Sequence, residues 1–201
     1  IDEAYEIEAK SLAFLSGTDP GGQEREQAIK LLVSSTKEIC TYAKSKGDLG
    51  ITLEVFDQEI EKKCLIGPAK DARRVAEEVR KEFDNFGLMV DLSHLPLLGE
   101  TPAQAILPIK DYLVHAHMGN CILKDKGHPG YGDQHPRFGI KGGENDVKEL
   151  SEYLKVLLDI GFLNPKNPPI VSFEVKPLAD ESSEVVVANA KRVLREAWAK
   201  I

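Results

Sequence analysis

Cysteine is scarce in this chain, whose 201 residues include only Cys40, Cys64 and Cys121. These three are odd in number and widely spaced, and they form no C-x-x-C pair, so neither a disulfide framework nor a zinc ribbon is predicted. No apolar run approaches the roughly 20 residues of a membrane-spanning helix, and no signal-peptide pattern is present. We therefore expect a cytoplasmic protein without a membrane partner, although the start at Ile1 leaves a removed leader open.

Positive charge is also in deficit, with 26 Lys and Arg against 33 Asp and Glu and a net charge of −7. Such a balance supplies no overall basic surface for nucleic acid or for an anionic membrane. The apolar share of 42% and the charged share of 29% are typical of a globular protein with a substantial core. We therefore expect a small-molecule partner and no binding of nucleic acid.

Short apolar runs alternate with helical patterns along the chain. The expected strands are 12–17, 50–55, 86–92, 111–118 and 168–175, and the expected helices are 23–46, 68–83, 101–107, 146–160 and 182–199. Alternation of this kind predicts an α/β fold with a parallel sheet. An eight-stranded barrel needs about 250 residues, so five of its eight units fit here. The alternatives are a missing N-terminal part, a second chain that supplies it, or an open sheet.

A few residues predict where these helices begin and end. Gly47 follows the first long helix as its expected C-cap, because glycine tolerates the backbone conformation found there. Pro68 is expected in the first turn of the next helix. Either Asn145 or Asp146 is expected to cap the helix that runs to about Ile160.

Four residues with metal-binding side chains close four of the expected strands. They are Glu54, Asp91, His117 and Glu174, in the runs ITLE, LMVD, YLVHAH and IVSFE. In an α/β barrel the strands deliver such residues to one rim. A single carboxylate at a strand end is as often a helix cap or an ion-pair partner, but a correlated set predicts a site. Three carboxylates and one histidine suit Mg, Mn or Co, with Zn or Fe as alternatives.

Histidine is confined to one part of the chain, where it occurs at His94, His115, His117, His128 and His135. Because histidine is the commonest metal ligand, this crowding indicates a site. His94 follows the aspartate in a D-x-x-H motif and is expected to face substrate or a second metal, unless it only caps the loop. His115 shares a strand face with His117 and is expected to support it or to pack. His128 is expected to be an ordinary loop residue.

Residues 118–146 form a long segment rich in glycine and proline, which is unusual inside a compact domain unless it builds a site. Asp133 and His135 occur there in D-x-H spacing, which suits a further metal or sugar hydroxyl groups. Arg137 or Lys124 would bind an anionic group of the substrate. The competing interpretation is a loop held only by its own hydrogen bonds.

Together these motifs resemble the xylose-isomerase-like barrel superfamily, which includes sugar isomerases, ketose 3-epimerases and inosose dehydratases and, more distantly, the endonuclease IV class. The matching pieces are LEVF at Glu54, VDLSH at Asp91, HAHMGN at His117 and FEVKP at Glu174, in family order. The resemblance implies a (β/α)8 TIM barrel. Residues 1–201 would then form a single domain with strands four to eight, and roughly the first three βα units would be absent from this chain.

The resemblance also implies a function. One divalent ion, Mn, Mg or Co before Zn, would be held by Glu54, Asp91, His117 and Glu174 and would grip two neighbouring oxygens of a sugar or sugar derivative. Glu54 and Glu174 would exchange a proton with the substrate through an enediolate, and His94 would bond a substrate oxygen. The expected protein is thus a metal-dependent isomerase or epimerase, with a homo-oligomer as one possible state.

The chain departs from some relatives within the superfamily. Ketose 3-epimerases carry an arginine six residues past the metal histidine, where this chain has Leu123, so that exact activity is doubtful. The same enolate chemistry also serves a lyase or dehydratase. Endonuclease-type relatives share the D-x-H motif of Asp133 and His135, which with His94 would complete another zinc site. However, they carry a histidine where this chain reads SGTDPGG, and its acidic charge disfavours DNA. A non-catalytic sugar-binding module is the remaining alternative.

Overall fold

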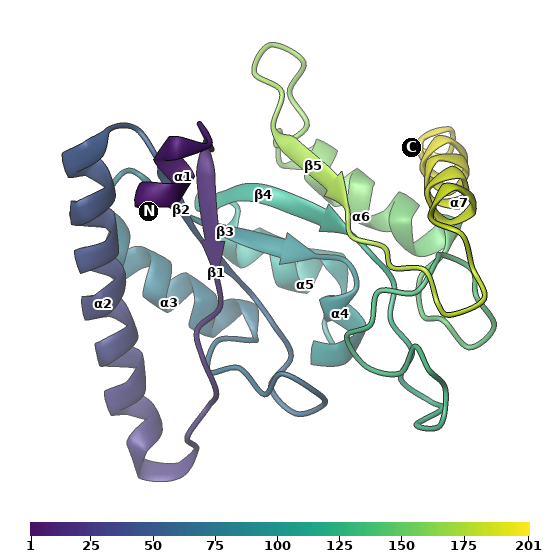
Figure 1. The fold of residues 1–201 in the computed structure, drawn as a ribbon, viewed down its shortest axis with the longest axis horizontal. Helices are drawn as coiled ribbons and strands as arrows, with labels where there is room; N and C mark the ends of the chain where they lie inside the picture. Colours follow the sequence, from purple (N-terminus) through teal and green to yellow (C-terminus); the bar gives the residue numbers. More distant parts are fainter.

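Five parallel strands form a single sheet in the computed structural model, which describes residues 1–201 (Figure 1). They are β1 (Ser11–Phe14), β2 (Gly50–Glu54), β3 (Phe86–Asp91), β4 (Leu113–Met118) and β5 (Ile170–Phe173). Each strand pairs with the next one along the chain, in the order β1-β2-β3-β4-β5. This neighbour order is that of a TIM barrel, and the sheet amounts to a half-barrel whose edge strands are β1 and β5.

Helices connect successive strands and cover one face of the sheet (Figure 1). The α-helices are α1 (Asp2–Glu6), α2 (Arg25–Lys46), α3 (Ala69–Arg80), α4 (His94–Leu98), α5 (Pro102–Ile106), α6 (Val147–Asp159) and α7 (Ser183–Trp198), with 3₁₀ turns η1 (Gly22–Glu24) and η2 (Leu107–Ile109). None of these helices combines the length and the apolar character that crossing a bilayer requires.

The predicted helix ends are mostly confirmed. Gly47 is the C-cap of α2 and donates its backbone N–H to Ala43 at 3.2 Å. Asp146 caps α6 in a reciprocal arrangement with Glu149, so the second of the two proposed caps is the right one. Pro68 precedes α3 rather than lying in its first turn, because its extended backbone, at ψ 144°, puts it outside the helix.

The first strand was predicted to reach residue 17, but it ends at Phe14. The residues that follow leave the sheet and bond instead to the segment after β2. Leu65 donates its backbone N–H to the carbonyl of Gly17 at 2.8 Å, and Ile66 donates to the hydroxyl of Ser16 at 2.9 Å. This tertiary pairing, which apolar periodicity does not reveal, shortens β1.

The two faces of the sheet differ in character because side chains alternate along each strand. Leu53, Leu88 and Val90 point toward the helices and are at most 2% exposed, within a core of 33 residues. Helix α3 completes this core with a stripe that includes Val75 and Val79, and burial of such a side chain contributes about 1.5–3 kcal/mol. The opposite face carries the polar residues of the strands, and these lead up to the candidate site.

Candidate metal centre

Four strand ends bring the predicted ligands together. Glu54 and Asp91 are the last residues of β2 and β3, His117 is the last but one of β4, and Glu174 follows β5 directly. Asp91 pairs with His117 in the β3–β4 register, so these two lie side by side at the same edge. One oxygen or nitrogen from each of the four lies within 4.8 Å of the others. The four side chains therefore converge in the structure, as the sequence predicts.

The facing atoms of this group lack ordinary partners. His117 Nδ1 lies 2.6 Å from Glu174 Oε2, 3.4 Å from Glu54 Oε1 and 3.8 Å from Asp91 Oδ2. These same four atoms are buried, and none makes a hydrogen bond of acceptable geometry. Buried polar atoms are otherwise almost always satisfied, so four that point at one another call for a ligand. Three oxygens and one nitrogen suit a divalent cation, and the residues therefore fit one.

Electrostatics within this group favour a positive charge at its centre. Burial lowers the pKa of His117, but the adjacent carboxylates of Glu174 and Glu54 outweigh burial and raise this pKa to about 10. Burial raises the pKa of Asp91 to about 6. Burial acts in the same direction on Glu174, but the adjacent ring of His117 outweighs it and lowers that pKa to about 2. The carboxylates thus favour a positive charge at this point, which either protonated His117 or a bound cation supplies.

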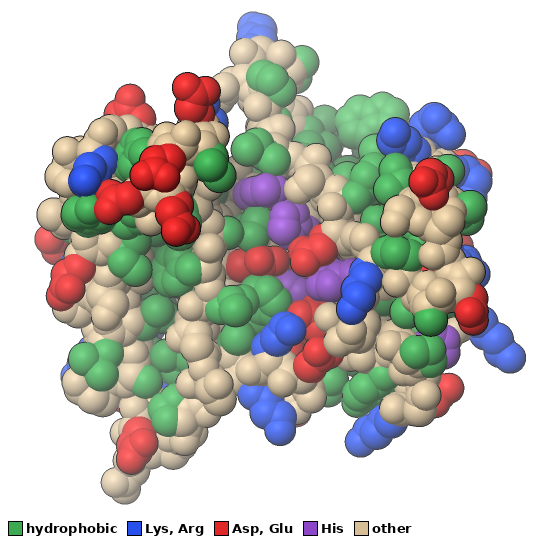
Figure 2. Space-filling model, in the orientation of Figure 1, with side chains coloured by type: hydrophobic (Ala, Val, Ile, Leu, Met, Phe, Trp, Pro, Cys, Tyr) green, Lys and Arg blue, Asp and Glu red, His purple; other side chains and the backbone are tan.

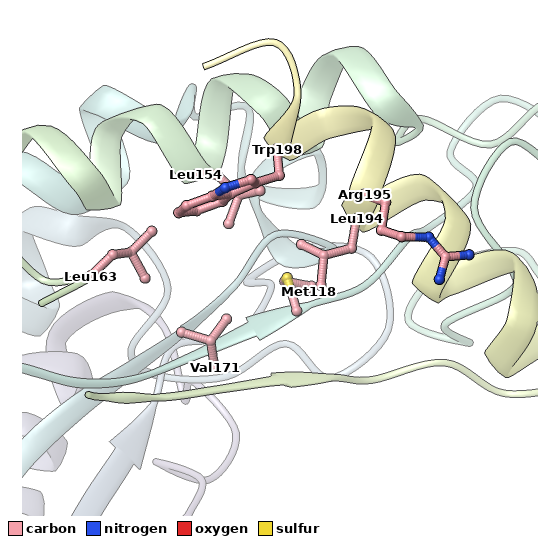
Figure 3. A pocket seen from close by; sticks show the side chains of 7 residues that line it. All are labelled: Met118, Leu154, Leu163, Val171, Leu194, Arg195 and Trp198. Carbon is pink, nitrogen blue, oxygen red and sulfur yellow. The ribbon is translucent and has the colours of Figure 1, made fainter. Parts of the chain in front are cut away.

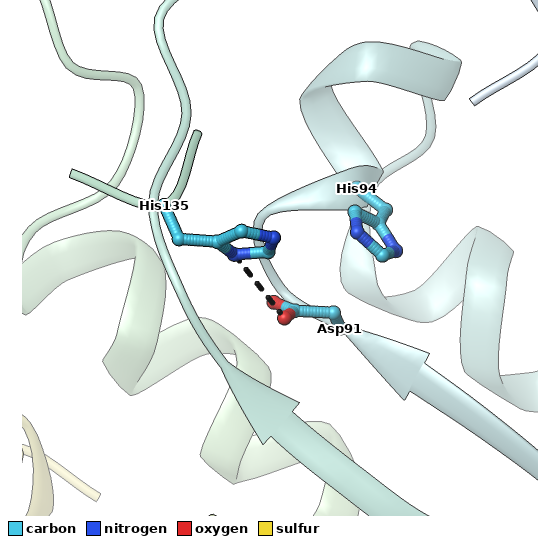
Figure 4. A group of neighbouring side chains, drawn as sticks. All are labelled: Asp91, His94 and His135. Atoms are coloured by element: carbon cyan, nitrogen blue, oxygen red, sulfur yellow. Dashed lines mark ion pairs between the residues drawn. The ribbon is translucent and has the colours of Figure 1, made fainter. Parts of the chain in front are cut away.

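A second group of side chains adjoins the first through Asp91. Figure 4 shows Asp91 between the rings of His94 and His135, each of which contributes to a second set with metal-binding geometry. Asp133 joins them, because its Oδ1 lies 3.0 Å from His94 Nε2 and 2.9 Å from His135 Nε2. All four side chains are buried or nearly so. The D-x-x-H and D-x-H motifs, far apart in sequence, therefore meet in one place.

The hydrogen bonds of His94 determine its charge state. Its Nδ1 faces the carbonyl of Val55 at 2.7 Å and must donate to it, while Nε2 faces the Asp133 carboxylate. A neutral ring would present a bare lone pair to that carboxylate, so His94 is positively charged or shares a cation with Asp133. Burial opposes this charge, but the Asp133 hydrogen bond outweighs it and raises the pKa of His94 to about 9. Both ring nitrogens thus have partners in the structure, and contact of His94 with a substrate stays a prediction.

The backbone of the long loop, residues 118–146, lies close against this site and has an unusual conformation there. His135 has a φ of +48°, in the left-handed region that residues with a Cβ seldom adopt, and such strain is common at functional sites. Gly119 lies against the site, since a Cβ there would be 2.9 Å from Asp91 Oδ1 and 3.0 Å from the carbonyl of Glu174. The close approach explains why glycine follows the β4 strand at this position.

Two buried asparagines hold the loop in place, and the sequence analysis had not assigned them this role. Asn145 donates from Nδ2 to the carbonyls of Leu92 and Gly119, both at 3.1 Å, and so ties the end of β3 to that of β4. Asn120 accepts the backbone N–H of Asn145 at 2.8 Å. A buried asparagine in a loop is a weak signal, and Asn145 had been considered only as a helix cap.

Other predicted site residues lie outside the two groups. The guanidinium of Arg137 pairs with Glu181 at 2.5 Å, and Lys124, with its side chain 83% exposed, pairs with Glu144 at 3.2 Å. Their charged ends pair with these carboxylates, and the binding of an anionic group by one of them stays a prediction. The ring of His115 packs edge to face against the ring of His117, with 4.6 Å between the ring centroids, as expected of a supporting residue. His128 is a loop residue, as expected, and its Nδ1 accepts the backbone N–H of Gly130.

The site opens on the polar face of the sheet. Figure 2 shows red and purple side chains gathered in the middle of this face, at the ends of the strands, with blue side chains at their border. An apolar groove of about 410 Å³ lies elsewhere, between β4, β5, α6 and α7, and includes Met118, Val171 and Trp198 (Figure 3). It contains none of the predicted site residues.

Comparison with known proteins identifies the family. Residues 1–195 match the family model described as the xylose isomerase-like TIM barrel, and the chain belongs to this family. None of the curated proteins matches it in sequence. The family match and the five-stranded parallel sheet together show a TIM-barrel-like α/β fold of the xylose-isomerase-like type.

Solved structures share the fold at low sequence identity. A D-tagatose 3-epimerase-like protein is 20% identical, with a TM-score of 0.69 over 99% of this chain and 67% of that one. An IolI protein with a bound zinc atom is 18% identical, with a TM-score of 0.65 over 98% and 63%. An AP endonuclease of family 2 from Brucella melitensis is 16% identical, with a TM-score of 0.67 over 93% and 62%. The chain thus spans about two thirds of the length of these proteins.

Proposed function

We propose that this chain carries the metal centre of a divalent-metal-dependent sugar isomerase or epimerase. The observation that supports the proposal most is the set of four buried, partnerless atoms contributed by Glu54, Asp91, His117 and Glu174. Parallel strands aim them at one point, as expected of a catalytic rim. Structural similarity to a D-tagatose 3-epimerase-like protein agrees with this chemistry, and similarity to a zinc-bound protein agrees with a metal.

The four residues would hold the cation, with Mn, Mg or Co preferred by the oxygen-rich donor set. When bound, a divalent ion would stabilise negative charge that develops on two neighbouring oxygens of the sugar. The backbone N–H of Ser93 donates to Asp91 Oδ1 at 2.6 Å and would hold this carboxylate in position for the ion.

Glu54 and Glu174 would transfer the proton, one as base and the other as acid. Glu54 Oε1 and Glu174 Oε2 face His117, so the substrate would meet the other oxygen of each, Glu54 Oε2 and Glu174 Oε1, the second of which also lies 3.4 Å from His135 Nε2. Because β2 and β5 are separated by two strands, these oxygens approach the reacting carbon from different sides. One glutamate would remove the proton next to the carbonyl and the other would return it. A lyase or dehydratase that acts on a keto-sugar or an oxidised glycoside would use the same first step.

A second candidate function is phosphodiester hydrolysis, as in the endonuclease-type relatives. One observation favours it: His94, Asp133 and His135 converge beside the first centre, with Asp133 within 3.0 Å of both rings. Similarity to an AP endonuclease fold is compatible with this idea. Against it, the net charge of −7 disfavours a polyanionic partner.

The position of the strands within a barrel is also a proposal. We infer that β1 to β5 correspond to strands four to eight of a (β/α)8 barrel, and that three further βα units close it. The two unpaired sheet edges and the coverage of about two thirds of related structures support this assignment.

Two measurements on the protein test the function. Metal analysis should find one divalent ion per chain, and NMR should detect deuterium from heavy water on the carbon next to a sugar carbonyl. Loss of water or of an aglycone, visible by mass, would indicate the lyase. Two or three tightly bound zinc ions together with cleavage of abasic DNA would reject the isomerase in favour of hydrolysis.

A further inference from the structure

The ladder of hydrogen bonds between β3 and β4 ends at the two metal-binding residues that these strands carry. Asp91 pairs with His117 in the last step of the register, and the backbone N–H of Leu92 donates to the carbonyl of His117 at 3.1 Å. Beyond this point β3 leads into α4, while β4 leads into the long loop. The two strands therefore part at the place where their ligands must keep a fixed separation.

The side chain of Asn145 bridges the two diverging strands. Its Nδ2 donates to the carbonyls of Leu92 and Gly119, both at 3.1 Å. An amide NH2 group has two hydrogens, so both are used, and only this end of the amide can face two carbonyls. Asn145 is 2% exposed, and its backbone N–H donates to Asn120 Oδ1 at 2.8 Å. The bridge is therefore anchored at its backbone and shielded from water.

One arm of this bridge leads directly to a metal-binding carboxylate. The carbonyl of Leu92 and the N–H of Ser93 belong to one peptide unit, and that N–H donates to Asp91 Oδ1 at 2.6 Å. Because a trans peptide is planar, a bond that fixes its carbonyl also fixes the direction of its N–H. A bond accepted at the carbonyl also polarises the peptide and strengthens the bond that its N–H donates. Asn145 is thus joined to Asp91 by two hydrogen bonds in series.

The other arm fixes the backbone that lies against the same carboxylate. A Cβ on Gly119 would be 2.9 Å from Asp91 Oδ1 and 3.0 Å from the carbonyl of Glu174, so the main chain of Gly119 packs closely on the site. Gly119 also follows His117 by two residues. The second oxygen of Asp91, Oδ2, lies 3.8 Å from His117 Nδ1 within the metal centre. Both arms of the bridge therefore constrain the separation of Asp91 and His117.

We propose that Asn145 is a positioning residue of the metal centre, which fixes the Asp91 carboxylate relative to His117 through the Leu92–Ser93 peptide and through Gly119. Asn145 itself touches neither the ion nor a substrate. The inference rests on the metal centre of the proposed function but not on the reaction. Groups that orient metal ligands contribute about tenfold to 100-fold to metal affinity. If Asn145 only anchored the loop instead, it would affect stability without affecting how the ion is coordinated.

Substitution Asn145→Leu tests the proposal, because leucine has nearly the shape of asparagine but donates no hydrogen bond. Asn120→Leu is the matched control. Asn120 is buried in the same loop and bonds to the backbone of Cys121, Arg137 and Asn145, but not to the Leu92–Ser93 peptide. Urea unfolding with a chelator present compares the stabilities, and calorimetry gives the Mn affinities. The visible absorption bands of the Co-loaded protein report coordination geometry, which a change of stability alone does not move.

Both variants should be less stable than the unaltered protein. Asn145→Leu should also reduce Mn affinity about tenfold or more and shift the Co absorption bands. Asn120→Leu should change Mn affinity by less than about threefold and leave these bands in place. An unaltered Co spectrum in Asn145→Leu, or an equal spectral change in Asn120→Leu, would overturn the assignment.

The unaltered protein decides if either variant does not fold. Zinc is diamagnetic, so NMR can follow individual amide signals as it binds. A cation on Asp91 draws charge away from the two hydrogen bonds in series, and the signals of the Ser93 N–H and the Asn145 side-chain NH2 should therefore shift together. The side-chain NH2 signal of Asn120 should stay in place. A stationary Asn145 signal during zinc loading would contradict the positioning role.

The same samples separate this proposal from the proposed function. Failure of the unaltered protein to bind Mn, Co or Zn would reject both. Metal coordination that depends on Asn145, combined with no deuterium exchange into any sugar, would reject the isomerase and retain the positioning role. Exchange into a sugar with coordination that is indifferent to Asn145 would reject the positioning role and retain the isomerase.

Discussion

His117 and Glu174 form an ion pair at the middle of the candidate metal centre, with Nδ1 and Oε2 separated by 2.6 Å. Their side chains are 17% and 37% exposed. The pair brings together β4 and the end of β5, and both atoms also face Glu54 and Asp91. The surrounding carboxylates raise the pKa of His117 to about 10 and so favour a positive charge at this point.

Metal affinity should therefore rise with pH. The pKa of His117 is raised to about 10, and a metal binds only the neutral ring, so loading must expel a proton at neutral pH. The apparent affinity for Mn should increase about tenfold per pH unit from pH 7 to 9. Below pH 6 the dependence should steepen, because the pKa of Asp91 is raised to about 6. Calorimetry in buffers of different ionisation enthalpy counts the released protons, and a pH-independent affinity would contradict the assignment.

Substitution Gly119→Ala should weaken metal binding. The added Cβ would lie 2.9 Å from Asp91 Oδ1 and 3.1 Å from His135 Nδ1, so a ligand must shift. We expect Mn affinity to fall about tenfold to 100-fold, as for other disturbances of groups around a metal site. Gly127→Ala is the control, because its Cβ would meet only Asp125 at 3.4 Å. Equal Mn affinity in the two variants would show that the geometry around Gly119 is unimportant.

Substitution Asp133→Asn should destabilise the metal-free protein. Asp133 and His94 are 2% and 1% exposed, and loss of one partner leaves the other charge buried, at a cost of about 3 kcal/mol at pH 7. The pKa of His94 is raised to about 9, so the pair contributes its full stability below pH 6.5 and loses it as pH rises through 9. Urea unfolding with a chelator present should show a difference that shrinks above pH 9. The exposed Asp180→Asn should have no effect, and a similarly small change for Asp133→Asn would refute this account.

Substitution of Glu54 or Glu174 by Gln should reduce turnover about 10²-fold to 10⁴-fold, the usual contribution of a proton-transferring group. Both variants should keep the fold, since the amide has the same shape as the carboxylate. Solvent deuterium incorporation at saturating Mn measures the effect. Glu152→Gln, on the exposed face of α6, serves as the control. Unchanged turnover in either variant would remove that glutamate from the mechanism.

The strand ends of the site could be predicted from the sequence because they follow from regular periodicity. Alternation of apolar runs with helical stretches predicted five parallel strands, and the carboxyl ends of parallel strands meet at one edge. The sequence alone therefore predicts that Glu54, Asp91, His117 and Glu174 lie together. The two short motifs around His94 and His135 also indicated a second group.

Loop positions could not be predicted in the same way, because loops carry no periodic signal. Arg137 and Lys124 were expected to bind an anion, and their ion pairs with Glu181 and Glu144 depend on tertiary packing that no local pattern reveals. The segment after β5 joins the long loop through the backbone N–H of Lys176, which donates to the carbonyl of His135 at 2.7 Å, and no local pattern reveals this contact. Helix α4 escaped prediction because it is a single short stretch that contains a proline.

Asp91 belongs to both side-chain groups, and its Oδ2 lies 3.8 Å from His117 Nδ1 and 3.7 Å from His135 Nδ1. One carboxylate cannot serve both neighbours independently, so whatever occupies one group changes how tightly the other holds its own proton or ion. Such linkage is reciprocal by thermodynamic necessity. The two halves of the site should therefore respond to loading as one cooperative unit.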